Sequence, residues 1–108
     1  MNISVRGRHL AISEALKAYA VRRLTLAIGS FASLVGDVEV RIADVNGPRG
    51  GVDKTSVITA VLRPIGTLVA RARHASAYSA IDRAAGRIRA LLVRRRTRAR
   101  RRDRRPAR

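Results

Sequence analysis

Residues 77–98 read AYSAIDRAAGRIRALLVRRRTR, and two periodicities in this stretch decide the fold. Apolar residues recur at spacings of three and four, as on one face of an α-helix. These are Tyr78, Ile81, Ala85, Ile88 and Leu92. Basic residues follow the opposite face, at Arg83, Arg87, Arg94 and Arg98. The stretch therefore predicts an amphipathic helix, capped by Ser76, that turns an apolar seam inward and arginines outward.

A second amphipathic helix is predicted near the start of the chain. Ser13 can cap its free amides, and Glu14 suits the positive end of the helix dipole. The apolar face of this helix consists of Leu16, Ala20, Leu24, Ala27 and Ile28. We expect Phe31 and Leu34, which follow the helix, to fold back on the core.

Four segments alternate with the period of two that is typical of strands. They lie at 2–7, from 37 onward, at 55–62 and at 68–73, and NGPRGG at 46–51 reads as a loop. The order is therefore β-α-β-β-β-α. Because two amphipathic helices need a sheet face to bury their seams, we predict an α+β fold. It is a two-layer sandwich, a four-stranded sheet with two helices packed on one face.

The charge is high and is shared by the whole chain. The 108 residues carry a net charge of +17 and are enough for one domain. Residues 94–108 hold ten arginines and Asp103, which leaves +8 for the rest. Such a balance predicts a polyanionic partner. We assign the domain to residues 1–98 and expect 99–108 to be a disordered Arg-rich tail, because like charges repel and no apolar residue anchors it.

Several classes of protein are excluded or disfavoured by what the sequence lacks. There is no cysteine, which excludes disulfides and thiolate metal sites. No apolar run approaches the ~18 residues of a membrane span. The N-terminus lacks the apolar core of a signal peptide. We expect a soluble, cytoplasmic protein without a membrane partner.

The spacing of the reactive residues does not indicate an enzyme active site. His9 and His74 have no regularly spaced acidic partner. The segment GPRGGVDKTS at 47–56 departs from a phosphate-binding loop, because Asp53 and Pro48 stand where two glycines are required. We therefore predict no enzyme activity, no metal, no cofactor and no small-molecule substrate. A small enzyme remains the third hypothesis.

The residue types favour binding of nucleic acid through its phosphates. Only Tyr19, Phe31 and Tyr78 are aromatic, and the last two are expected in the core, which argues against an aromatic stacking platform. No acidic residue occurs from 83 to 102. An ordinary solvated helix face mixes both signs, so this one favours a phosphate-binding surface.

Two motifs resemble a known family. NISVRGRHLAISEALKAYAVRRL at 2–24 resembles the opening of the ribosome hibernation-promoting factors, also called ribosome-associated translation inhibitors. AYSAID at 77–82 is similar to the Met-Tyr-Ala-Ala-Ile-Asp that starts the last helix of that family. The predicted order of elements also matches, and the fold it implies is akin to double-stranded-RNA-binding domains. The resemblance covers roughly residues 1–98.

The resemblance implies a function. Such proteins bind the small ribosomal subunit and its 16S rRNA in the channel of mRNA and tRNA, and so inhibit translation. They keep idle ribosomes inactive and protected in stress or stationary phase. By position, the residues that match basic places of the family are Lys17, Arg23, Arg87, Arg94 and Arg96. To these RNA-binding candidates we add three further basic residues of the same two helices, Arg22, Arg83 and Arg98.

The chain also departs from the family pattern. It lacks the C-terminal dimerisation domain of long members, so it resembles the short type. The Arg-rich tail is not part of the common pattern. It leaves open an alternative, a nonspecific, nucleoid-type RNA- or DNA-binding protein whose affinity comes from the tail.

Overall fold

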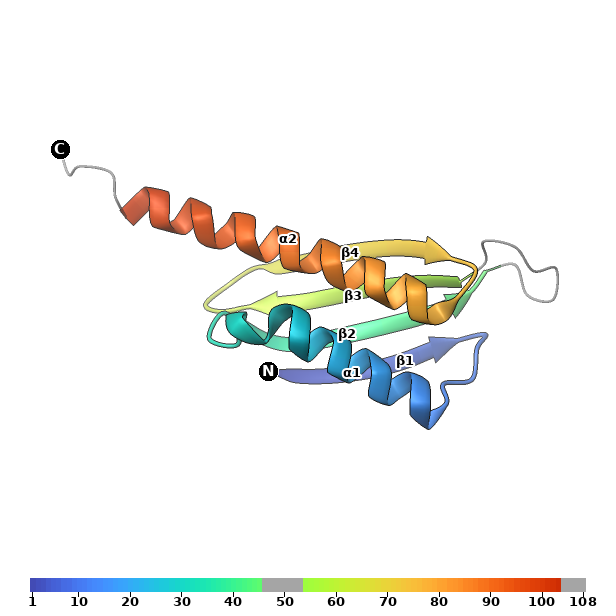
Figure 1. Ribbon diagram of the computed structural model, residues 1–108. Coiled ribbons are helices and arrows are strands. Elements are labelled where there is room, and N and C mark those ends of the chain that lie inside the picture. The colour runs from blue at the N-terminus through green and yellow to red at the C-terminus, as the bar shows by residue number, and fades with distance from the viewer. Residues whose placement is uncertain (46–53, 104–108) are drawn as a thin grey trace.

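The computed structural model describes residues 1–45 and 54–103 and has one sheet with both helices on the same face (Figure 1). The elements in chain order are β1 (Asn2–Arg8), α1 (Glu14–Ile28), the short 3-10 helix η1 (Gly29–Phe31), β2 (Val35–Asp44), β3 (Lys54–Leu62), β4 (Thr67–His74) and α2 (Ala77–Asp103). This order confirms the predicted two-layer α+β sandwich.

The four strands follow one another across the sheet in the order β1-β2-β3-β4. β1 and β2 are parallel, and α1 forms the crossover between them, whereas β2, β3 and β4 form an antiparallel meander. The register aligns Arg6, Arg41, Val57 and Arg71 in one row across all four strands. Side chains alternate between the two faces of a strand, so this row lies on the open face, away from the helices.

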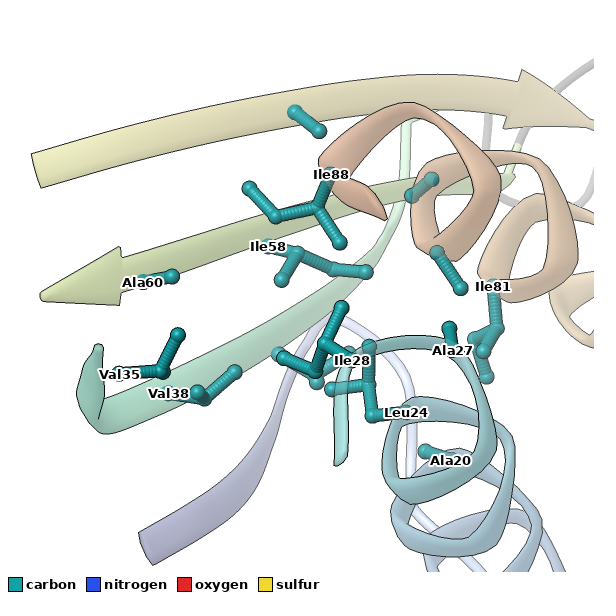
Figure 2. Packing of buried hydrophobic residues seen from close by; sticks show 14 of the residues in the cluster. Ala20, Leu24, Ala27, Ile28, Val35, Val38, Ile58, Ala60, Ile81 and Ile88 are labelled. Atoms are coloured by element: carbon teal, nitrogen blue, oxygen red, sulfur yellow. The ribbon is translucent and has the colours of Figure 1, made fainter. Parts of the chain in front are cut away.

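The core lies between the inner sheet face and the apolar seams of the helices. Leu24 and Ile28 of α1 and Ile88 of α2 point toward Ile58 on the sheet (Figure 2). The predicted seam residues Ile81, Ala85, Ile88 and Leu92 are all fully buried. Phe31 is buried at the start of the turn into β2, as predicted, and Leu34 packs against the core.

Both predicted N-caps are present. The Ser13 hydroxyl accepts a hydrogen bond from the Leu16 amide at 3.0 Å, and the Ser76 hydroxyl accepts one from Ser79 at 3.4 Å. Each hydroxyl satisfies one of the amides that the first turn of a helix leaves without a partner. The two serines therefore set where the helices begin over the sheet.

The prediction that Tyr78 is a core residue is wrong. Its exposed fraction is 42%, and its ring meets Tyr19 of α1 edge-to-face with 4.9 Å between centroids. Tyr78 precedes Ile81 by three positions, about 60° around the helix axis. That offset directs the ring toward α1 instead of the sheet.

The last helix is longer than the predicted domain. We placed the start of a disordered tail at residue 99, but α2 is helical to Asp103 and extends past the β3–β4 hairpin (Figure 1). Arginine and alanine are both strong helix formers, and side chains on a helix spread outward from one another, which limits their repulsion. The predicted loop at 46–51 and the predicted disorder of 104–108 lie outside the described residues.

Candidate nucleic-acid interface

Four exposed arginines form one row on the outer side of α2. We call Arg83, Arg87, Arg94 and Arg98 the outer arginine row. At 100° and 1.5 Å per residue, they fall within an arc of about 60° and extend over about 22 Å of helix. Ile81 and Ile88 of the buried seam lie on the opposite side. The predicted position of these four arginines away from the apolar seam thus agrees with the burial along α2.

One member of the row is also tied to the sheet. A guanidinium N–H of Arg87 donates a hydrogen bond to the backbone carbonyl of Arg71. Arg71 belongs to β4, which forms one edge of the sheet, so the contact joins α2 to that edge. Arg87 therefore holds α2 against the sheet edge as well as contributing charge to the row.

The ion pairs of the described chain involve basic residues other than those of the outer arginine row. Ion pairs join Arg6 to Glu39 at 3.7 Å, Arg41 to Glu39 at 3.1 Å, Lys54 to Asp44 at 3.3 Å and Arg23 to Asp82 at 3.2 Å. Among the side chains that the structure describes, those of residues 1–45 and 54–101, no ion pair involves the outer arginine row. The carboxylates of these pairs, Glu39, Asp44 and Asp82, thus neutralise basic residues on the sheet and at the helix junction and not in the row.

A small polar network joins α1 to α2. The Tyr19 hydroxyl donates to Asp82 Oδ1 at 2.5 Å, and Arg23 Nε lies 3.2 Å from the same oxygen. The hydrogen bond to Asp82, reinforced by burial, raises the pKa of the Tyr19 phenol above its usual value of 10.0. Arg23, a candidate for phosphate binding, therefore already has a carboxylate partner within the protein.

Arg96 lies apart from the row as well. Its guanidinium carbon is 4.2 Å from the centroid of the Phe31 ring, a distance typical of a cation–π contact. Arg89 approaches the same ring at 5.9 Å and donates a hydrogen bond to the Ala27 carbonyl at 2.8 Å, near the C-terminus of α1. The sequence did not single out Arg89, because only the fold brings it to the end of α1.

The candidates on α1 do not extend the row. Lys17 is exposed, but it is two positions from Tyr19, which contacts α2, and so lies about 160° around the helix from that contact. Arg22 is also exposed and is in no ion pair of the described chain. The eight predicted residues therefore divide into one row on α2, two partnered arginines and two separate cations on α1.

The histidines show no catalytic arrangement. His9 is exposed and has a φ of 56°, in the turn after β1. His74 Nδ1 accepts a hydrogen bond from the Ser76 amide at 3.1 Å and so helps to form the turn into α2. In the described part of the chain, no three His, Cys, Asp or Glu side chains gather as they would around a metal ion.

The length of α2 also raises the question of a membrane span. Its 27 residues would reach across a bilayer, but they are rich in arginine. None of the helices in residues 1–45 and 54–103 is both long and apolar enough to cross a membrane.

A helix with a row of exposed arginines, packed on a four-stranded mixed sheet, defines a small α+β domain with a strongly basic last helix. The chain belongs to the family described as Sigma 54 modulation protein / S30EA ribosomal protein, whose model matches residues 3–100. This match confirms the family resemblance read from the two motifs.

Two solved structures are similar to this fold. The N-terminal domain of Protein Y from Thermus thermophilus has a TM-score of 0.72 and 25% identity, over 87% of this chain and 98% of that one. A ribosomal subunit interface protein from Coxiella burnetii has a TM-score of 0.76 and 16% identity, over 90% of this chain and 99% of that one. No curated protein sequence matches the chain.

Proposed function

We propose that this protein binds the small ribosomal subunit through 16S rRNA, in the channel that mRNA and tRNA use, and thereby keeps idle ribosomes inactive. Membership of an S30EA ribosomal protein family supports a ribosomal partner, as does the likeness to a protein described as a ribosomal subunit interface protein. The observation that carries the proposal is the outer arginine row, which extends over about 22 Å of helix and has no carboxylate partner among the described side chains.

The proposed mechanism is occupancy. Guanidinium groups bind phosphates with two parallel hydrogen bonds and keep their charge at any cellular pH. The row on α2 contacts the RNA backbone, while the sheet fixes the orientation of that helix. A protein that fills the channel excludes mRNA and tRNA from the same space, so inhibition requires no chemical step. The site of action would be the cytoplasm, where ribosomes work in stress or stationary phase.

Competition on purified small subunits tests this proposal. The labelled protein is sedimented through sucrose with vacant subunits and with subunits that already carry mRNA and tRNA. We expect co-sedimentation with vacant subunits and its loss on occupied ones, together with inhibition of translation in a cell-free system. Equal binding to vacant and occupied subunits would place the protein outside the channel.

A nonspecific nucleic-acid-binding protein is the second candidate, favoured by the continuation of α2 through Arg98, Arg100 and Arg101 beyond the last buried residue of the seam, Leu92. Both candidates predict strong salt dependence: six to ten neutralised phosphates lower affinity about 10³- to 10⁵-fold between 50 and 200 mM salt. Affinity for random duplex DNA separates them. A dissociation constant for DNA equal to that for vacant subunits supports the nonspecific binder.

A further inference from the structure

A groove lies between the C-terminal half of α2, the β3–β4 hairpin and the connection from η1 to β2. Its volume is 680 Å³, within the range of sites for small molecules. Leu34, Pro64 and Ile65 contribute apolar surface, and Ile65 is 82% exposed. On α2 the groove lies toward the side of the buried seam, since Leu92 lines it, and of the outer arginine row only Arg98 lines it.

Hydrogen bonds fix the walls of the groove. The Arg63 amide donates to the Leu34 carbonyl at 2.7 Å, which ties the hairpin to the connection opposite. The Leu62 amide donates to the Gly66 carbonyl at 2.8 Å and closes the hairpin itself. Gly66 has a φ of 124°, and a Cβ there would come within 2.8 Å of the Arg95 guanidinium. The glycine thus lets Arg95 lie over the hairpin at the edge of the groove.

The charged residues that line the groove are all basic. Five of its lining residues are arginines, and among the described residues that line it there is no carboxylate. Three of them, Arg63, Arg95 and Arg98, are exposed around the apolar surface. A ligand that fits must therefore combine an anionic group with a flat or apolar body.

Arg96 supplies a flat surface inside the groove. Its guanidinium lies over the Phe31 ring at 4.2 Å, and the same side chain lines the groove. Phe31 is almost fully buried and cannot itself meet a ligand. The planar guanidinium that it supports can, because unpaired bases stack on arginine planes as they do on aromatic rings.

We propose that this groove binds one unpaired nucleotide of an RNA, with its base against Arg96 and Ile65 and its phosphate on Arg63 and Arg95. An acidic peptide would meet the same charges, but its carboxylates bind the edge of a guanidinium and not the face on which a base stacks. The inference rests on the proposed function, since it adds recognition of an extruded base to the phosphate contacts of the outer arginine row.

Two RNA hairpins of identical stem and loop test the inference, one with a single bulged adenosine and one fully paired. Their affinities are measured by fluorescence anisotropy with the full chain. We expect wild type to prefer the bulged hairpin about 5-fold or more, the lower end of what stacking of one base contributes. Ile65→Ala and Arg96→Lys should remove most of that preference and leave affinity for the paired hairpin within about 2-fold, since Lys keeps the charge but not the plane.

Matched controls lie outside the groove. Leu26 is 75% exposed and does not line the groove, so Leu26→Ala should keep the preference, and so should Arg8→Lys on β1. Thermal melts check that each variant folds. Since Arg96→Lys removes packing over Phe31, the exposed Ile65 provides the variant that cannot fail through loss of the core.

The outcomes separate the two proposals. If wild type does not sediment with vacant small subunits, the proposed function fails. If it sediments with them but binds both hairpins equally, or if Ile65→Ala keeps the preference, the groove assignment alone is overturned. In a third result, Ile65→Ala weakens the binding of a labelled Glu- and Leu-rich peptide but leaves the binding of both hairpins unchanged. That result would assign the groove to an acidic peptide instead.

Discussion

At the junction of the two helices, some charged side chains contact one another instead of solvent or a ligand. Asp82 of α2 accepts a hydrogen bond from the Tyr19 hydroxyl and pairs with Arg23. Both partners belong to α1 and contact the same carboxylate oxygen, Oδ1. The pair with Arg23 is partly exposed and contributes little on its own, since such pairs are typically worth up to about 1 kcal/mol. Its main effect is to direct Arg23 to α2 and away from a ligand.

The phenol of Tyr19 provides a pH test of that junction. The protonated phenol is the form that donates to Asp82, so its folded-state pKa lies above the unfolded value of about 10. The stabilisation is therefore present below pH 10 and is lost as the pH rises through the folded-state pKa.

A titration can isolate this phenol. In Tyr78→Phe, Tyr19 is the only tyrosine, and we expect its absorbance at 295 nm to titrate above the midpoint of the same protein in denaturant. The Tyr19→Phe variant is the control, with no phenol at position 19 to titrate. Coincident midpoints in the folded and denatured protein would mean that the hydrogen bond to Asp82 is not formed in solution.

Ser56 is a buried polar residue with no visible role in the core. Its hydroxyl is fully buried on the inner face of β3 and has no hydrogen-bond partner among the described residues. A buried hydroxyl without a partner costs about 1–3 kcal/mol. We therefore expect Ser56→Ala to raise the free energy of unfolding in urea, by about 1 kcal/mol. A loss of stability of that size would mean that the hydroxyl does have a partner.

At the scale of elements, α2 has two independent faces. Ile81 and Ile88 are fully buried against the sheet and α1, whereas Arg83 and Arg94 are exposed on the other side. Stability and binding should therefore respond to different substitutions on the same helix. The hydrogen bond of Arg87 to the sheet edge makes it the one member of the row for which the two effects are mixed.

A pair of variants tests this separation. Ile88→Val should cost about 0.5–1.5 kcal/mol of folding stability, because it removes a buried methyl group, and should leave affinity for small subunits unchanged. Arg94→Glu should change stability by less than about 0.5 kcal/mol, as surface substitutions do, and should weaken binding. Urea denaturation and sedimentation report the two effects. Equal destabilisation by both variants would place Arg94 in the packed interior.

The elements also show what the sequence could predict. A period of 3.6 places Ile88 inward and Arg83 outward without any knowledge of the fold, and the alternation along β4 places Ala70 inward in the same way. Partners distant in sequence have no such signal. Nothing local connects Arg96 to Phe31 or Arg23 to Asp82, so part of the predicted RNA-binding set proved to be engaged inside the protein.

At the scale of the whole molecule, the two faces differ in charge compensation. The helix side carries the outer arginine row, whereas the open sheet face holds arginines and the carboxylate of Glu39 within ion-pair distance of two of them. Net charge alone, at +17, would attract RNA to any side. We propose the helix side as the binding side because no carboxylate pairs with the row among the described side chains of residues 1–45 and 54–101.

The salt dependence of small-subunit binding tests this assignment most directly. Arg83→Glu/Arg94→Glu and the control Arg8→Glu/Arg71→Glu lower the net charge equally, the first on the row and the second at exposed positions of β1 and β4. Each lost phosphate contact reduces the slope of log affinity against log salt by about one. We expect the row variant to lose about two units of slope and the control to keep the wild-type slope. An equal loss in both variants would contradict the account, because net charge and not the row on α2 would then govern binding.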